Sequence, residues 1–584
     1  MFRSTRKCSF GEFDAREPSV SLSSSTQEVL DWGGTAAMPP QGHAVVSPIA
    51  HAQPLGLQPS RICRWQFALP VVRQRKEHPL KRQRVITVAA DGSSNTAFAI
   101  EAPGSDDDVL ECPDLKDKLK SRDSPFKPHD NFGGGFASDG DRVALQSMRF
   151  ATPHSAGATC MTVGQLSTVQ GNGTGALPKL ADAADDQVCV PLPPWAVRAG
   201  ARETIYHDPS TVNAAIVTCG GLCPGLNDVV QGLVRKLEDY GVPDGNILGI
   251  RYGYKGFYNR KQKPVVLNSK AVEGIQLQGG TILGTSRGGA DIKEIVKRID
   301  MWGIDMVFVV GGNGGNAGAA AIQAQCEKDG VVCNIVGVPK SIDNDILVID
   351  KCFGFDTAVE EAQTALLAAK VEAISADQGI GLVKLMGRSS GFIAMQASMA
   401  SGVVDICLIP EVNFNLDGEH GLMAYIETLL ADKGHCVICV AEGAGQEILM
   451  SGDVQTDLSG NPILKDVGPW LKSEIKKRFK EADVKYIDPS YLIRSIPTTS
   501  NDRIYCKILA HNAVHAAFAG FTGVTVGLVN THYVILPIPV VIQAPRRVDP
   551  QGKQWNRLRS SIGQPQFYKD PAASGATSTA GAGV

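Results

Sequence analysis

The sequence predicts an α/β fold, with parallel sheets covered by helices on both faces. Between residues 204 and 545, apolar runs of strand length alternate with glycine turns and segments of helical periodicity. This alternation is typical of parallel sheets, whose strands are joined by helices. The glycine clusters all fall at the carboxyl ends of the apolar runs, where such sheets bind their ligands. We therefore expect one composite site at the strand ends.

The first half of this region contains five strand-like runs. "NAAIVTCGG" (213–221) is followed by an amphipathic helix that ends at Gly241, a residue suited to a helix C-terminus. "GGTILGTSRGG" (279–289) then leads into the helix "ADIKEIVKRIDMWG", and "DMVFVVGGNGG" (305–315) into a helix that ends near Gly330. The other two runs are "ILGIRYGYKGF" (247–257) and "VVCNIVGVPK" (331–340).

The second half repeats the pattern. Strand-like runs that end in polar or charged residues occur at 378–390, 404–411 and 435–445. We expect a nucleotide-binding α/β domain at 204–375 and a sugar-phosphate-binding α/β domain at 376–545, the C-terminal part of which packs back on the first domain. Residues 546–584 would form a C-terminal extension with a low-complexity tail.

Composition excludes several classes of protein. The 584 residues carry a net charge of −3, which argues against a nucleic-acid-binding protein. The longest apolar stretch, at 524–542, is interrupted by Asn530, His532 and two prolines, so we expect no membrane span. "CVIC" (436–439) has metal-ligand spacing, but residues three apart in a strand face opposite sides. We interpret these cysteines as core thiols of a reducing compartment.

The N-terminal third differs from the rest. From 51 to 90 the chain has eight Lys or Arg and one acid, Glu77. A basic, serine-containing leader is typical of organelle transit peptides, although five acids lie before residue 32. We interpret 1–90 as a transit peptide for the plastid, the alternative being an untargeted tail of a cytoplasmic protein, and 91–203 as a flexible extension.

The strand ends offer several loops suited to phosphate groups. "GGNGGNAGAA" (311–320) could belong to a dinucleotide fold, but Pro339 and Lys340 stand where the ribose-binding acid would be needed. No Walker A motif occurs. Instead, glycine loops combine with the cations Arg287, Lys340, Arg388 and Arg494 and with the acids Asp343, Asp345 and Glu442. Many anion contacts together with placed carboxylates favour phosphoryl transfer, in which an acid accepts the proton of the attacking hydroxyl.

Five motifs together resemble the 6-phosphofructokinase family, most closely its plant and algal branch that uses ATP. They are "PKSIDNDI", "FGFDTAVEEA", "LMGRSSGFIAMQASMASG", "EGAGQ" and "YIDPSYLIRS", and the similarity extends from about 204 to 565. The resemblance implies two similar Rossmann-like domains with the active site in the cleft between them. It also implies phosphorylation of fructose 6-phosphate by ATP to fructose 1,6-bisphosphate, with Mg²⁺ as cofactor.

The resemblance further implies roles for individual residues. Asp343 would accept the proton of the sugar 1-hydroxyl, and Arg287 would neutralise charge on the transferred group. Residues expected around ATP are Gly220, Gly221, Arg287, Gly288, Gly311, Gly312, Asn313 and Gly314. Residues expected to bind the sugar phosphate are Ser341, Ile342, Asp343, Met386, Gly387, Arg388, Glu442, Tyr491 and Arg494.

Some residues carry a structural interpretation beside the functional one. Asp345 and Asp356 could be helix-capping or turn acids. Met386 is expected to be a core residue that offers its backbone to the substrate. The histidines are expected to be packed rather than catalytic; they are His511, His515 and His532.

Three positions depart from the family pattern. Asn313 replaces an aspartate that assists Mg²⁺ in many members, so the metal would be held mainly by phosphates and water. Ser341 replaces threonine, and Gly315 replaces the threonine of plant relatives. Gly314 stands where pyrophosphate-using members carry aspartate, and it leaves room for the α-phosphate of ATP.

Two alternatives remain: a pyrophosphate-dependent enzyme, with which this chain shares Lys340, and a non-catalytic regulatory subunit. We expect the protein to be a homo-oligomer, with a tetramer favoured.

Overall fold

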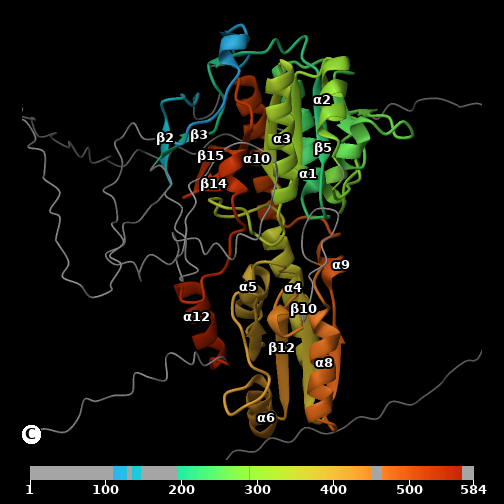
Figure 1. The fold of residues 1–584 in the computed structure, drawn as a ribbon, viewed down its shortest axis with the longest axis vertical. Coiled ribbons are helices and arrows are strands. Elements are labelled where there is room, and N and C mark those ends of the chain that lie inside the picture. Colours follow the sequence, from blue (N-terminus) through green and yellow to red (C-terminus); the bar gives the residue numbers. More distant parts are fainter. Residues whose placement is uncertain (1–108, 128–134, 146–194, 289, 450–462, 568–584) are drawn as a thin grey trace, which may run out of the picture. The chain divides into compact units, whose positions relative to one another are not determined.

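The computed structural model describes residues 109–127, 135–145, 195–288, 290–449 and 463–567 (Figure 1). The expected transit peptide therefore lies outside the described residues. The described parts form a nine-stranded sheet, a four-stranded sheet and a two-stranded antiparallel pair of β1 (Arg122–Asp123) with β4 (Thr204–Ile205).

The larger sheet has the strand order β2-β3-β15-β14-β9-β8-β5-β6-β7. Its centre, from β14 to β6, is parallel, whereas the outer strands pair antiparallel. In chain order its strands are β2 (Arg142–Ala144), β3 (Trp195–Arg198), β5 (Ala214–Thr218), β6 (Ile247–Ile250), β7 (Val265–Val266), β8 (Met306–Gly311), β9 (Asn334–Pro339), β14 (Val524–Val529) and β15 (His532–Pro537).

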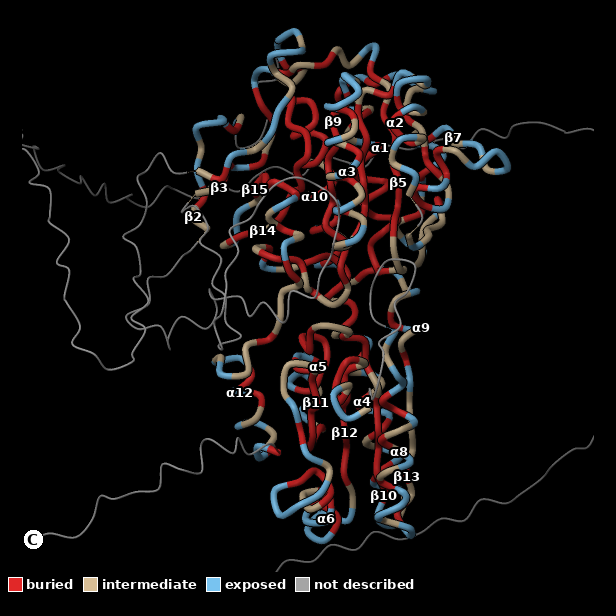
Figure 2. Tube along the Cα trace, in the orientation of Figure 1, coloured by how far each residue is buried: buried red, intermediate tan, exposed pale blue. Residues whose placement is uncertain are grey.

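Helices cover both faces of the larger sheet because its central strands are apolar on both faces. In β5, Ala214 and Ile216 pack in the core formed with α1 (Leu226–Tyr240) and α10 (Ser500–Phe518). Their neighbours Ala215 and Val217 pack in the core formed with α2 (Ile292–Met301) and α3 (Asn313–Asp329). Figure 2 shows these strands as almost entirely buried. Helix α1 ends as expected at Gly241, whose φ of 102° lies in the left-handed region.

The smaller sheet is entirely parallel, in the order β11-β12-β10-β13. Helices α4, α5 and α12 share a core with one face, and α6 and α8 share a core with the other. The elements are α4 (Phe355–Ile374), β10 (Gly379–Leu385), α5 (Phe392–Ser401), β11 (Ile406–Leu408), α6 (Leu422–Lys433), β12 (His435–Ala441), α7 (Gln446–Leu449), α8 (Val467–Arg478), β13 (Asp483–Ile487), α9 (Ser490–Ile493) and α12 (Lys553–Ile562). Helix α11 (Ile538–Val541), which follows β15, packs instead in the cores of the larger sheet. The expected α/β class, with its two parallel-sheet domains, is confirmed.

The "CVIC" motif lies within strand β12. Cys436 and Cys439 are both buried, and they belong to the cores on opposite faces of the sheet. Burial raises the pKa of the Cys436 thiol well above its usual value. Within the described residues, no group of three or more His, Cys, Asp or Glu side chains is arranged to hold a metal ion. The interpretation as core thiols therefore agrees with the structure.

Parts of the expected flexible extension are ordered. Strands β2 and β3 lie within residues 91–203, and they extend the larger sheet by pairing antiparallel with β15 and with each other. A strand of three or four residues is too short for its periodicity to stand out in a sequence, so this part of the fold was not predicted. Among the described helices, none is both long and apolar enough to cross a membrane.

Candidate active site

The loop after β9 carries the catalytic candidates. Lys340 continues the strand, because its backbone N–H donates to the carbonyl of Gly311 at 2.9 Å. The chain then turns at Asn344, whose φ of 57° is left-handed and whose side-chain oxygen accepts from the N–H of Cys352 at 2.8 Å. Asparagine tolerates this conformation better than most residues do. The turn brings Asp343 and Asp345 into one charged cluster.

Asp343 has the electrostatics of a general base. Burial raises its pKa to about 7, and the charges of Asp345 and Glu442 add to this effect. The backbone N–H of Arg388 and the ammonium of Lys340 act in the opposite direction. Its Oδ1 atom is buried without a hydrogen-bond partner among the described residues. A pKa near neutrality and an unused acceptor atom are what proton abstraction from a hydroxyl requires.

Asp345 lies inside this cluster rather than at a helix N-terminus. Its Oδ1 accepts from the hydroxyl of Ser341, and its Oδ2 accepts from Nδ2 of Asn313 at 3.3 Å. Burial raises its pKa as well. By contrast, Asp356 lies in the first turn of α4 and pairs with Lys351 at 2.6 Å, as expected for a structural acid.

The oxygen atoms around Asn313 suit a magnesium ion. Oδ1 of Asn313 is buried without a partner among the described residues, and Asp345 adds a carboxylate nearby. Magnesium prefers oxygen ligands and is commonly held by one or two carboxylates together with substrate phosphates and water. These donors therefore fit a magnesium ion that arrives with a phosphorylated substrate.

The N-terminus of α3 is open to an anion. The helix begins at Asn313 after Gly312, and within the described residues no side chain caps its first N–H groups. Such exposed N–H groups, together with the helix dipole, favour phosphate. A Cβ on Gly312 would lie 2.9 Å from the carbonyl of Lys340, whereas no described atom lies within 4 Å of the corresponding position on Gly314. Gly314 is therefore the unobstructed position in this turn.

Three cations converge on the loop after β5. A Cβ on Gly221 would lie 3.6 Å from Nη2 of Arg287 and 4.0 Å from Nη1 of Arg494. A Cβ on Gly220, where φ is +91°, would lie 3.3 Å from Nζ of Lys340. These residues come from distant parts of the chain: Arg287 precedes α2, Lys340 follows β9, and Arg494 follows α9. The cluster is suited to phosphoryl oxygens.

The loops of the smaller sheet are held by backbone contacts. Met386 is buried, as expected of a core residue, and Gly387 adopts a φ of +135°, which favours glycine. The carbonyl of Gly387 accepts from the N–H of Gly443 at 3.0 Å, and the N–H of Glu442 donates to the carbonyl of Leu385 at 2.9 Å. The loops with Arg388 and Glu442 therefore lie against each other.

A hydrogen bond links this part to the catalytic loop. The hydroxyl of Ser390 donates to the carbonyl of Asp343 at 3.1 Å. Ile342 packs against the main cores of both sheets. The structure thus brings Asp343 together with the Arg388 loop and Glu442, although these residues lie far apart in the sequence.

The remaining predicted residues lie at the edge of this arrangement. Tyr491, in α9, is 74% exposed, and the guanidinium of Arg494 stacks over its ring at 4.7 Å. Gly288 adopts a left-handed φ of 60° immediately after Arg287. Lys340 and Asp345, which were noted at the strand ends but were assigned no ligand-binding role, lie in the cluster. The signal for Asp345 was its spacing of four residues from Ser341.

The three histidines lie outside this cluster. His515 is buried, and its Nδ1 bonds the hydroxyl of Tyr240 at 2.7 Å; burial lowers its pKa to about 3. Burial also lowers the pKa of His511 to about 4. His532 is exposed and bonds the carbonyl of Asn530 at 2.8 Å. Their expected role as packing or surface residues agrees with these positions.

Comparison with known proteins identifies the family. Residues 213–517 match the family described as "Phosphofructokinase". ATP-dependent 6-phosphofructokinase 5, chloroplastic, of Arabidopsis thaliana is 50% identical over 453 residues, which cover 75% of this chain and 79% of the relative. An ATP-dependent 6-phosphofructokinase of Borreliella burgdorferi is 44% identical over 385 residues, covering 64% of this chain and 86% of the relative.

A solved structure supports the fold. A pyrophosphate-dependent phosphofructokinase of Marinobacter aquaeolei superposes with a TM-score of 0.51 at 19% identity, covering 62% of this chain and 92% of that one. At this identity the likeness concerns the fold alone. Family match, close relatives and the convergence of the predicted motifs agree: the chain belongs to the phosphofructokinase family.

Proposed function

We propose that this chain is an ATP-dependent 6-phosphofructokinase, which transfers the γ-phosphoryl group of ATP to the 1-hydroxyl of fructose 6-phosphate. The observation that carries the proposal is the pairing of Asp343, a partly buried acid with a pKa of about 7 and an unused oxygen, with a cluster of three cations at the same strand ends. Phosphoryl transfer to a hydroxyl group uses a proton acceptor close to a surface that binds the phosphate anions.

In this proposal Asp343 removes the proton of the sugar hydroxyl as it attacks the γ-phosphorus. Arg287 and Lys340 neutralise charge on the transferred group and on the phosphates. Arg388, Glu442, Tyr491 and Arg494 bind the sugar phosphate, the arginines through its anion and Glu442 through hydroxyl groups. Ser341 keeps Asp345 in place through its hydrogen bond.

The ATP phosphates would lie along the glycine loops. Gly220 and Gly221 admit them beside the cations, and the turn from Gly311 to Gly314 offers them the N–H groups of α3. Asn313 and Asp345 would hold a magnesium ion with phosphate and water. The ion would supply charge neutralisation at the transferred group.

A coupled assay of the purified chain tests the donor and the activity together. Fructose 6-phosphate is offered with ATP or with pyrophosphate, and formation of fructose 1,6-bisphosphate is recorded. We expect turnover with ATP. Turnover with pyrophosphate alone would establish the pyrophosphate-dependent alternative, and no turnover with either donor would favour a regulatory subunit.

We also propose a plastid location and a homo-oligomer, preferably a tetramer. The location is supported by the basic leader and by two relatives named as chloroplastic. Fusing residues 1–90 to a fluorescent reporter should direct it to plastids, and a cytosolic reporter would contradict the location. Light scattering on a sizing column measures the number of subunits, and a monomer would contradict the oligomer.

A further inference from the structure

A short segment after β15 contacts the catalytic loop. The backbone N–H of Arg546 donates to the carbonyl of Asp345 at 2.8 Å. Its guanidinium Nη1 donates to the carbonyls of Ile349 at 3.1 Å and Asp350 at 2.8 Å. Three hydrogen bonds from one residue therefore fix both ends of the loop that follows Asp343.

The same segment also contacts the smaller sheet. The N–H of Val548 donates to Oε1 of Glu411 at 2.7 Å. That carboxylate also accepts from the N–H of Gly391, at 3.0 Å through Oε1 and 3.1 Å through Oε2. The guanidinium of Arg546 stacks 4.9 Å over the ring of Phe392, the first residue of α5.

The turn that contains Arg388 begins at Gly387 and ends at Gly391. A Cβ on Gly391 would lie 2.4 Å from Cβ of Ile409 and 3.1 Å from Oε2 of Glu411, so the turn fits closely against the end of β11. Glu411 is thus the contact shared by this turn and the segment that holds the catalytic loop. Burial raises its pKa to about 7, and the N–H groups of Val548 and Gly391 counteract this shift by favouring the carboxylate.

We propose that residues 546–548 and Glu411 form a strap that holds the catalytic loop at Asp343 and the sugar-binding turn at Arg388 in a fixed mutual position. Arg546 and Glu411 are positioning residues in this proposal, since they act through Asp345 and Gly391. The proposal rests on the proposed function for the meaning of the two loops. Neither residue belongs to the motifs that identified the site.

The strap predicts different kinetic effects at its two ends. Loss of Glu411 frees the turn with Arg388, so the KM for fructose 6-phosphate should rise while the KM for ATP stays within about twofold. Loss of the Arg546 guanidinium contacts loosens the loop with Asp343, so kcat should fall. A displacement of about 1 Å in an active site can cost on the order of 100-fold in rate, so we expect changes of about tenfold or more.

The first test compares Glu411→Ala with Asp405→Ala. Asp405 is a matched control because it precedes β11 at the opposite end, is buried, and also accepts from a backbone N–H, that of Val437 at 2.9 Å. Both variants should lose thermal stability, but only Glu411→Ala should raise the KM for the sugar phosphate. Glu411→Gln retains one oxygen for the two N–H donors and should recover part of the loss. An unchanged sugar KM in Glu411→Ala, or an equal rise in the control, would overturn the proposal.

The second test compares Arg546→Lys with Arg202→Lys. The guanidinium of Arg202, in the segment between β3 and β4, also donates to two carbonyls, those of Gly200 at 3.0 Å and Arg198 at 2.8 Å. Lysine keeps the charge but not the forked geometry. We expect the loss of kcat in Arg546→Lys alone, and equal kcat values in the two variants would contradict the strap.

Hydrogen exchange on the full chain separates the strap from the proposed function. Peptides that contain residues 386–392 should exchange faster in Glu411→Ala than in the parent or in Asp405→Ala, whatever reaction the protein catalyses. If the parent shows no phosphofructokinase activity but the exchange changes as expected, the proposed function fails and the strap stands. If the parent is active and the exchange is unchanged, the strap fails.

Discussion

At the scale of single residues, the chemistry depends on Asp343. Burial and two neighbouring carboxylates raise its pKa to about 7, while the backbone N–H of Arg388 and the ammonium of Lys340 counteract this shift. Its neighbours Lys340, Ser341 and Asp345 were visible in the sequence as a cluster. The contacts that link Lys340 to Gly220 and Asp343 to Ser390 were not, because they join residues that the chain order separates.

Replacing Asp343 by asparagine should abolish most of the activity. Asparagine keeps the shape but cannot accept the proton, so kcat should fall by roughly 10² to 10⁴. The parent's kcat should rise with pH and level off above about 7, since the base must be ionised. Initial rates between pH 5.5 and 8.5 with saturating substrates measure both effects. Near-normal kcat in the variant would reject Asp343 as the proton acceptor.

The same substitution should stabilise the protein at alkaline pH. The pKa of Asp343 is raised in the folded state, so the folded protein retains a proton that the unfolded chain releases between about pH 4 and pH 7. Stability is therefore lost as pH rises through this window. At pH 8, Asp343→Asn should gain about 1 kcal/mol or more in the free energy of unfolding, since each pKa unit corresponds to about 1.4 kcal/mol. Denaturant unfolding at pH 4 and pH 8 tests this, and an equal gain at both values would contradict it.

Gly314 should decide how well ATP is accepted. An aspartate there fits the fold, since no described atom lies within 4 Å of the added Cβ and an acid suits the first turn of a helix. Its charge should repel the α-phosphate and lower kcat/KM for ATP by at least about tenfold, which corresponds to about 1.4 kcal/mol. Gly314→Ala is the control that adds the Cβ without the charge. If Gly314→Asp uses ATP as well as Gly314→Ala does, the α-phosphate binds elsewhere.

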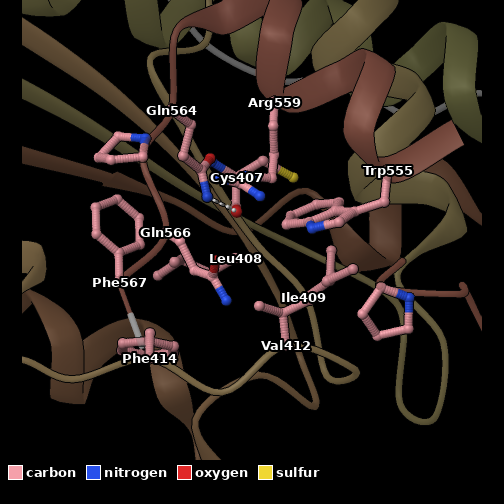
Figure 3. A pocket seen from close by; sticks show the side chains of 12 residues that line it. Cys407, Leu408, Ile409, Val412, Phe414, Trp555, Arg559, Gln564, Gln566 and Phe567 are labelled. Carbon is pink, nitrogen blue, oxygen red and sulfur yellow. Dashed lines mark hydrogen bonds between the residues drawn. The ribbon is translucent and has the colours of Figure 1, made fainter. Parts of the chain in front are cut away.

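At the scale of elements, the C-terminal segment covers an edge strand. Strand β11 is the edge of the smaller sheet, and edge strands invite pairing with other chains. The side-chain amide of Gln564 accepts from the N–H of Cys407 at 2.7 Å and donates to its carbonyl at 3.1 Å (Figure 3). The side chain of Gln564 thus makes the pair of hydrogen bonds with Cys407 that a neighbouring strand would otherwise make.

Gln564→Ala should weaken this edge without affecting catalysis. It leaves a buried N–H and a buried carbonyl of Cys407 without partners, at a cost of about 1–3 kcal/mol for each unsatisfied group. We expect a lower Tm and faster aggregation, with unchanged KM values. Gln564→Glu keeps an oxygen that accepts from the N–H of Cys407 but loses the amide that donates to its carbonyl. Its Tm should therefore lie between the Tm of the parent and that of Gln564→Ala. Thermal unfolding with light scattering measures this, and a parental Tm in Gln564→Ala would contradict the protective role.

The elements also show what a sequence can reveal. Strands β5, β8 and β9 are largely apolar runs at or just before glycine or proline, and α1 has an apolar stripe and a glycine at its C-terminus, so all four were predicted. Strands β2 and β3 are short and gain their stability from β15, a partner far along the chain. Gln564 and Glu411 likewise contact residues that are far from them in the sequence, so no local sequence pattern indicates their roles.

At the scale of the whole molecule, the fold class could be predicted, because apolar runs alternate with glycine turns and helical segments; the candidate site residues came from the resemblance of their motifs to the family. The strand order could not be predicted, since it depends on which distant runs pair. We expected the C-terminal part of 376–545 to pack back on the first domain, but no sequence pattern showed that β14 and β15 would lie between β9 and β3.

This interleaved strand order has a consequence for protein synthesis. As the chain leaves the ribosome, β9 emerges early but must wait for β14, because Val336 pairs with Val524. Strands β10 to β13 are all available before then and can complete their own sheet. We expect the smaller sheet to fold while the larger one still has an open edge, which slows folding because distant pairings are slow to form. Nascent chains stalled before residue 524 should therefore resist proteolysis in the smaller sheet and be cut in the larger one.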